Sequence, residues 1–233
     1  MKILAFDTSS DACSVALQVD DQLLVDHRLA AQQHAALLLP MINALMSDAG
    51  LTPTQLDGLI YGRGPGSFTG VRIAVACAQG IALGADIGAV GISTLQTIGQ
   101  GAYRAHNVNR VSIGIDARMD EVYFCEYQLD DNQLMQPCLD EQIGSAENLM
   151  RAGPGHWAGT GVERYAQHLL ENERIEASKI LKGCLAQAQD LITIGEASVI
   201  AGELESPELA SPVYLRNKVA LTTAERDALR SSK

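Results

Sequence analysis

The chain has 233 residues, a length that fits either one large domain or two small ones. Hydrophobic residues make up 47% of it and aromatic residues only 4%, which predicts a globular core built from aliphatic side chains. The formal net charge of -11 repels a phosphate backbone, so we expect no direct binding to nucleic acid.

The cysteines and the N-terminus indicate the compartment. Five cysteines are odd in number and form no C-x-x-C pair, which favours reduced, structural thiols. The first ten residues, MKILAFDTSS, lack the regions of a secretory signal and read as a strand. No apolar stretch approaches the roughly 20 residues that span a bilayer. We therefore expect a cytoplasmic protein that does not enter a membrane.

The first half opens with a hairpin pattern. Residues 3–15, ILAFDTSSDACSV, read as an apolar strand, a tight polar turn and a second, alternating strand. We expect further elements in the order strand 22–29, helix 34–48, strand 59–61, helix 69–84 and strand 87–91. Antiparallel strands followed by alternating strands and helices predict a mixed sheet with helices on its faces.

The hairpin pattern occurs twice. SIGIDARMDEVYF, starting at Ser112, repeats the first segment without a gap and aligns Asp116 with Asp7. The rest of the second half is predicted as hairpins over 110–137, a helix at 145–151, a strand before residue 159, helices at 162–172 and 185–201, and a short strand at 212–216. We predict two related halves, residues 1–105 and 106–216, and a polar tail over 217–233.

This duplicated layout, with an acidic residue at the tip of each hairpin, is that of the actin-like (ASKHA, ribonuclease H-like) α/β fold, with mixed sheets flanked by helices. Five segments extend over almost the whole chain: ILAFDTSSDACSVAL, YGRGPGSFTGVRIAVACAQGIALG, GISTLQTIGQGAY, IDARMDEVYF and PVYLR. In these segments the chain resembles the TsaB (YeaZ) family. The resemblance departs at Asp120, where many relatives carry glycine, and is loose over residues 139–190.

The glycine-rich segment GRGPGSFTG, residues 62–70, follows a strand and enters a helix. It is not a Walker A loop, because no Gly-Lys-Ser/Thr follows. One interpretation is structural: the loop packs against the first hairpin, and Ser67 or Thr69 caps the helix. The other is a degenerate nucleotide cleft, faced by both hairpin aspartates, whose candidate binding residues are Asp7, Thr8, Ser10, Gly66 and Ser67.

Autonomous nucleotide chemistry is not expected. Actin-like ATPases carry a glycine beside the first aspartate, whereas this chain has Thr8-Ser9-Ser10 there. We expect no cofactor to be bound independently, with ATP or ADP bound weakly or at the interface of a complex. An autonomous ATPase or small-molecule kinase is the alternative function.

No metal site or catalytic residue is predicted. No two of the five histidines lie three or four positions apart, so no metal-binding helix face exists. The resemblance implies that the catalytic relative, TsaD, carries paired histidines where this chain reads STLQTI at residues 93–98. A peptidase is the weakest alternative, because Cys77 lies in a small-residue helix rather than an electropositive turn.

Two helices form the predicted partner surface. The helix at 34–48 is apolar around most of its circumference, and the helix at 69–84 carries two small-residue faces. Burial in the chain's own core is the competing interpretation; otherwise another subunit would cover them. The predicted interface residues are Leu37, Leu38, Met41, Ile42, Leu45, Arg72, Val75, Cys77 and Gly80.

The resemblance implies a non-catalytic subunit rather than an enzyme. Such a subunit would pair through these helices with TsaD, and with itself as a homodimer when TsaD is absent. Together with the ATPase TsaE, the complex would transfer a threonylcarbamoyl group to the tRNA adenosine next to the anticodon.

Overall fold

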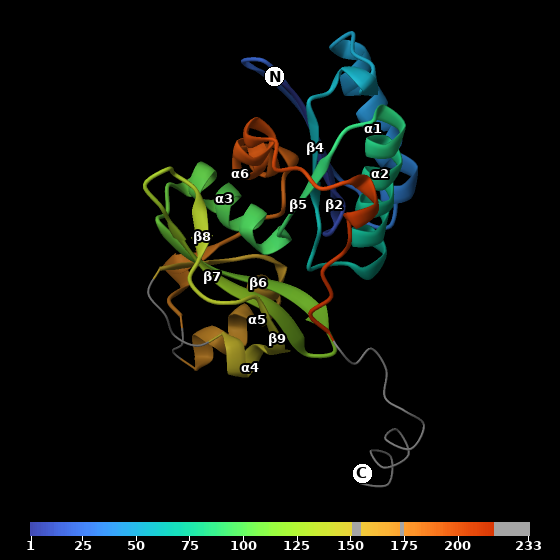
Figure 1. Ribbon diagram of the computed structural model, residues 1–233. Helices are drawn as coiled ribbons and strands as arrows, with labels where there is room; N and C mark the ends of the chain where they lie inside the picture. The colour runs from blue at the N-terminus through green and yellow to red at the C-terminus, as the bar shows by residue number, and fades with distance from the viewer. Residues whose placement is uncertain (151–154, 173–174, 217–233) are drawn as a thin grey trace, which may run out of the picture.

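The computed structural model describes residues 1–150, 155–172 and 175–216, which fold around two sheets (Figure 1). The first sheet has the strand order β3-β2-β1-β4-β5. β1 pairs antiparallel with β2 and parallel with β4, so the sheet is mixed as predicted. Its strands are β1 (Lys2–Asp7), β2 (Ala12–Val19), β3 (Gln22–Leu29), β4 (Gly58–Gly62) and β5 (Ala89–Ile92).

Helices cover both faces of the first sheet. α1 (His34–Asp48) and α2 (Phe68–Ala85) pack on the face that holds Leu4 and Phe6. α6 (Ala188–Ala201) packs on the opposite face, against Ile3 and Ala5. Successive strand residues point to opposite faces, so the continuous apolar run of β1 fits a strand buried on both sides. A short 3-10 helix, Pro53–Gln55, precedes β4.

The second sheet has the order β11-β10-β6-β7-β8, with β9 also pairing with β7. α3 (Thr94–His106) packs on one face against Ile113, and α4 (Ala146–Leu149) and α5 (Thr160–Glu171) lie on the other. The strands are β6 (Arg110–Arg118), β7 (Glu121–Leu129), β8 (Met135–Pro137), β9 (Gln142–Ser145), β10 (His156–Ala158) and β11 (Ile180–Leu181). The predicted class, a duplicated actin-like α/β fold with mixed sheets flanked by helices, is confirmed.

One helix from each half packs on the sheet of the other half, an arrangement that we call the exchange of α3 and α6. α3 lies within the predicted first half but packs on the second sheet, whereas α6 lies within the predicted second half but packs on the first. The two helices also contact each other between the sheets. The predicted division between residues 105 and 106 therefore separates the two sheets, but it does not keep each sheet together with all the helices that cover it.

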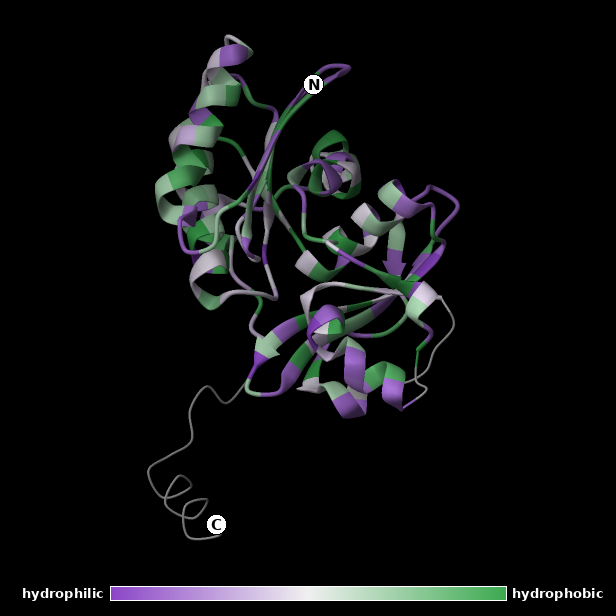
Figure 2. Ribbon diagram, turned by 180° about the vertical axis from the view of Figure 1, so that it is seen from behind, coloured by the Kyte–Doolittle hydropathy of each residue, from purple (hydrophilic) through white to green (hydrophobic). Residues whose placement is uncertain are grey.

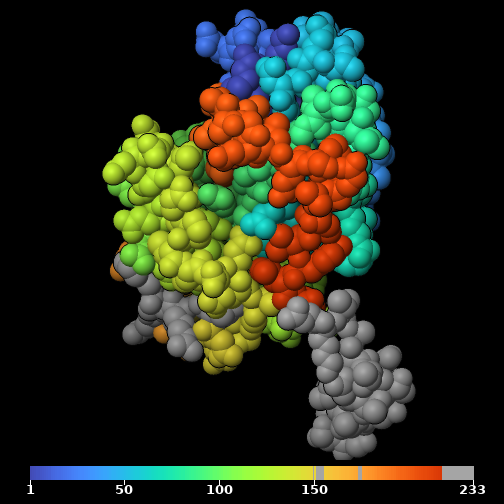
Figure 3. All heavy atoms as spheres, in the orientation of Figure 1, coloured from blue at the N-terminus to red at the C-terminus, as the bar shows by residue number. Residues whose placement is uncertain are grey.

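The segment after α6 also crosses between the halves (Figure 3). It passes a 3-10 helix, Pro207–Leu209, and ends beside the second sheet, where Arg216 bonds Glu121. The strand predicted at residues 212–216 is wrong, because this stretch forms a single backbone bond, Val213 N to Arg63 O, rather than a ladder. The predicted tail at 217–233 and the end of the helix predicted at 145–151 lie outside the described residues.

In the described part of the chain, α2 is the one helix long and apolar enough to be a membrane span by length and composition alone. Core helices of soluble proteins also pass that test. Val71, Ala74 and Val75 lie on the side of α2 that packs into the core of the first half.

Candidate functional site

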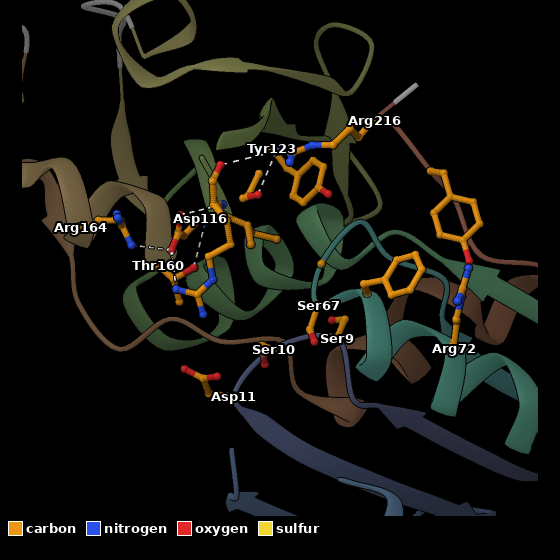
Figure 4. Close-up of a pocket in the computed structure, with 16 residues that line it drawn as sticks. Ser9, Ser10, Asp11, Ser67, Arg72, Asp116, Tyr123, Thr160, Arg164 and Arg216 are labelled. Atoms are coloured by element: carbon orange, nitrogen blue, oxygen red, sulfur yellow. Dashed lines mark hydrogen bonds and ion pairs between the residues drawn. The ribbon is translucent and has the colours of Figure 1, made fainter. Parts of the chain in front are cut away.

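A cavity of about 800 Å³ lies between the two halves (Figure 4). The turn between β1 and β2 and the start of α2 form one wall. The end of β6, the start of α5 and the chain segment before residue 217 form the other. Its lining residues are Ser9, Ser10, Asp11, Gly66, Ser67, Phe68, Arg72, Ile115, Asp116, Ala117, Arg118, Tyr123, Thr160, Arg164, Tyr214 and Arg216.

The glycine-rich loop is packed tightly against the first hairpin. A Cβ at Gly66 would lie 2.4 Å from the Ser9 carbonyl oxygen, and one at Gly70 would lie 1.9 Å from that of Thr8. Ser67 donates its N–H to Ser9 O at 2.7 Å and caps α2, its Oγ accepting from Gly70 N at 3.4 Å. The structural interpretation of this loop, with Ser67 as the N-cap, is confirmed.

Asp7 is sealed away from the cavity. Its side chain is fully buried, and Oδ1 accepts from the N–H and the hydroxyl of Ser9 at 2.8 and 2.7 Å. Oδ2 has no hydrogen-bond partner among the described residues, and a Cβ at Gly62 would lie 1.8 Å from it. Burial raises the pKa of this carboxyl above its ordinary value, against the hydrogen bonds from Ser9. The expectation that Asp7 faces the cleft is therefore wrong.

Thr8 is also enclosed. It is fully buried and donates its Oγ1 hydroxyl to Gly70 O at 2.7 Å. Of the five predicted nucleotide-cleft residues, Ser10, Gly66 and Ser67 line the cavity, whereas Asp7 and Thr8 do not. The nucleotide-binding role of the first three stays a prediction.

Asp116, the counterpart of Asp7, does line the cavity, where two arginines hold it. Arg118 Nη1 and Arg164 Nη1 lie 3.3 and 3.1 Å from its Oδ2, and the Arg118 N–H donates to Oδ1 at 3.0 Å. Thr160 Oγ1 accepts from the Asp116 N–H at 3.1 Å. The turn that follows places Arg118, Met119 and Asp120 at φ values of 63°, 54° and 59°.

The rim of the cavity is aromatic and cationic. The Arg72 guanidinium lies 3.6 Å from the centroid of the Phe68 ring, and its Nε donates to Tyr214 Oη at 2.8 Å. The Phe68 and Tyr214 side chains remain about half exposed. Arg216 reaches the second half, donating to Glu121 at 2.6 Å and to Ala117 O at 2.9 Å.

Sequence reasoning missed most of the second-half wall. Only Asp116 was identified, through the repeat, although Arg118 and Tyr123 follow it within the repeated hairpin and Tyr214 and Arg216 stand in PVYLR. Thr160 and Arg164 lie at the start of α5, in the stretch where the resemblance is loose.

The structure also bears on a metal centre and on reactive thiols. No group of His, Cys, Asp or Glu that could hold a metal occurs among the residues that the structure describes. Burial raises the pKa values of the Cys13, Cys77 and Cys125 thiols to about 11, so at neutral pH these groups stay protonated.

The predicted partner residues divide into two groups. Leu38, Met41, Ile42, Leu45 and Val75 are at most 8% exposed and belong to the core of the first half. For these five the competing interpretation is correct, because the structure places them on the side of each helix that packs against the first sheet.

The other four lie on the accessible side. Arg72 and Gly80 are exposed, and Leu37 and Cys77 are half-buried. The outer surface of the helix pair also carries Ala36, Leu39, Pro40, Ala44, Ile73, Ala76, Leu83 and Gly84.

Comparison with known proteins shows consistent relatives. The family model for TsaD, tRNA N6-adenosine threonylcarbamoyltransferase, matches residues 25–228. The chain is 40% identical to the tRNA threonylcarbamoyladenosine biosynthesis protein TsaB of Escherichia coli (strain K12), over 94% of this chain and 96% of that one. It is 35% identical to TsaB of Haemophilus influenzae, over 94% of this chain and 95% of that one.

The solved structures agree. The fold matches YeaZ from Pseudomonas aeruginosa with a TM-score of 0.82 and 37% identity, over 92% of this chain and 99% of that one. On these sequence and structural grounds the chain belongs to the TsaB (YeaZ) family of tRNA threonylcarbamoyladenosine biosynthesis proteins.

Proposed function

We propose that this chain is a non-catalytic subunit that binds and supports a TsaD-type catalytic subunit during threonylcarbamoyl transfer to the tRNA adenosine next to the anticodon. TsaE is the further partner, and the isolated chain forms a homodimer in the cytoplasm. Family membership supports the pathway, since its relatives carry the name of threonylcarbamoyladenosine biosynthesis proteins.

The observation that carries the subunit role is the outer surface of α1 and α2, which we call the docking face: Ala36, Leu39, Pro40, Ala44, Ala76, Gly80, Leu83 and Gly84. All eight residues are exposed, and Leu39 and Leu83 are 50% and 66% exposed. In Figure 2 these two helices are coloured mainly green and white, whereas α4 and α5 carry much purple.

Small residues dominate the docking face. A Cβ at Gly80 or Gly84 would meet no atom of the described residues within 4 Å, so the backbone of α2 is open to a close neighbour there. Contiguous apolar surface of this kind marks an interaction site, and small residues allow two helix pairs to approach closely. A partner helix pair would therefore bury this face.

The test is reconstitution with purified TsaD, TsaE and tRNA. Gly80→Arg and Leu83→Glu change exposed positions, so we expect a folded chain that loses TsaD binding by at least about tenfold and loses stimulation of tRNA modification. Light scattering of the variants alone measures the homodimer, which should dissociate.

Ile200→Glu is the matched control. Ile200 is 69% exposed on α6, on the opposite face of the first sheet, and its change should leave binding and stimulation intact. If TsaD modifies tRNA equally well without this chain, the subunit role is wrong. Normal stimulation by both docking-face variants would instead reject the proposed surface.

A further inference from the structure

The cavity between the halves has a charge opposite to that of the whole chain. Its lining contains four arginines and two aspartates, whereas the chain has a formal net charge of -11. Arginine stays protonated at any physiological pH, and its planar fork of donors matches phosphate oxygens. The lining therefore favours an anionic ligand in a molecule that otherwise repels anions.

The second-half wall supplies two arginines whose guanidinium N–H donors are mostly unused. In the described part of the chain, Asp116 is the single carboxylate within ion-pair distance of either Arg118 or Arg164. The two side chains are 78% and 46% exposed. A guanidinium has five N–H donors, so one shared carboxylate leaves most of them available to a ligand.

The first-half wall supplies complementary groups. Arg72 contacts the Phe68 ring and Tyr214 Oη and has no carboxylate partner among the described residues. The N-terminus of α2, an 18-residue helix, lies in the same wall beside Ser67, and Ser10 lines the cavity nearby. Helix N-termini favour negative charge, so cationic and dipolar groups face one cavity from both halves.

The cavity offers few ligands to a magnesium ion. Magnesium in phosphate sites is held by one or two carboxylates together with the phosphates. Asp7 is enclosed, and Asp116 is held by two arginines, which leaves Asp11 as the remaining lining carboxylate. The four lining arginines outnumber this one carboxylate, so guanidinium groups are the main neutralising charge available to a ligand here.

We propose that the cleft binds the phosphate chain of a small di- or triphosphate as the metal-free anion, between Arg118 and Arg164 on one wall and Arg72 and the start of α2 on the other. A volume of about 800 Å³ suits a ligand of nucleotide size rather than a single orthophosphate. Cations on two facing walls likewise suit a ligand with charge at more than one position.

The experiment is calorimetric titration of the purified chain in EDTA at low salt, about 50 mM, with tripolyphosphate, pyrophosphate, ATP and orthophosphate. We expect the first three to bind saturably and orthophosphate to bind more weakly. Excess Mg²⁺ should weaken the binding, because it neutralises the phosphates without gaining protein ligands. ATP binding no tighter than tripolyphosphate would show that the phosphate chain is what the cleft recognises.

The variants identify the site. Arg118→Ala and Arg164→Ala should each raise the dissociation constant by about tenfold or more, the effect of losing a charge-assisted hydrogen bond. Arg118→Lys keeps the charge and should recover part of the loss. Arg28→Ala, which removes an equal charge from an exposed ion pair with Asp26 on β3, should change nothing.

Four results would overturn the proposal: no saturable binding, binding that requires Mg²⁺, equal binding by the Arg118→Ala variant, or binding of a short RNA but of none of the small phosphates. Thermal melts confirm that each variant is folded. Because the titration uses the chain alone, its outcome is independent of the reconstitution with TsaD.

Discussion

At the scale of single residues, Asp7 differs most from its repeat partner. Asp116 meets two arginines at the cavity surface, whereas Asp7 is fully buried and one of its oxygens accepts no hydrogen bond from the part of the chain that the structure describes. A buried carboxylate without a counter-ion destabilises the fold whenever it is charged. Burial accordingly raises its pKa in the folded state above the unfolded value.

Asp7→Asn should therefore stabilise the protein at neutral pH, by on the order of 1 kcal/mol. The asparagine oxygen can still accept both bonds from Ser9. Because the folded pKa is raised, the cost of the charged form is absent below the unfolded pKa, about 3.9, and is complete above the folded pKa. Thermal melting across pH should show the gain vanish on acidification. Asp11→Asn, a change at an exposed neighbour, is the control and should not raise the melting temperature at neutral pH.

The sequence could identify Asp7 as a candidate site residue, but it could not predict that the side chain is enclosed. Its place at a hairpin tip follows from the repeat, whereas its enclosure also depends on Gly62, which approaches from β4 and is far from Asp7 in the sequence. The arginines of the second-half wall were missed for the same reason, since Arg118 and Arg164 meet only after β6 and α5 are packed together.

At the scale of the element, α2 uses its glycines in two ways. Gly70 lies where the helix crosses the first hairpin, and a Cβ there would collide with the Thr8 carbonyl. Gly80, ten residues later on the same helix, has open space around it. The first glycine is required by packing, and the second lowers the stability of the isolated helix.

Gly70→Ala should destabilise the chain by about 1–3 kcal/mol, because backbone atoms must move apart. Gly80→Ala should stabilise it by up to about 1 kcal/mol through helix propensity. Urea denaturation of the two variants separates these effects. Equal changes for both would mean that the approach to Thr8 is not a packing constraint.

Element prediction succeeded where periodicity was strong and failed where tertiary contacts decide. The hairpins and the helices at 34–48 and 69–84 follow from their patterns and agree closely with β1, β2, α1 and α2. The stretch at 212–216 resembles a strand in composition, yet within the described residues it makes one backbone bond and pairs with no strand. The pattern also could not show which side of α1 or α2 faces the sheet.

At the scale of the whole molecule, an ion pair joins the two exchanged helices. Arg104 on α3 donates to both carboxylate oxygens of Asp190 on α6, at 2.7 and 3.0 Å. The Asp190 side chain is 1% exposed. Burial raises its pKa, and the bonds from Arg104 oppose that rise. The contact therefore fixes the two sheets relative to each other.

Arg104→Met should cost about 1–3 kcal/mol at neutral pH, because it leaves the buried Asp190 carboxylate without its cation, while the 41% exposure of Arg104 lowers the cost below that of a fully buried pair. Without Arg104 the folded pKa of Asp190 rises further, so the loss should diminish as acid protonates the group. The double variant Arg104→Met/Asp190→Leu should regain most of the stability. Arg28→Met, which breaks an exposed pair, should cost less than about 1 kcal/mol. Additive effects in the double variant would contradict this account.

The exchange of α3 and α6 has a consequence for synthesis of the chain. The ribosome completes β5 at Ile92, but the residues of α6 that cover Ile3, Ala5 and Ile60 come about a hundred positions later. At usual elongation rates that interval is on the order of ten seconds. During this interval one apolar face of the nascent first sheet lacks α6, the helix that covers it. A fragment that ends near residue 105 should therefore need a chaperone to stay in solution.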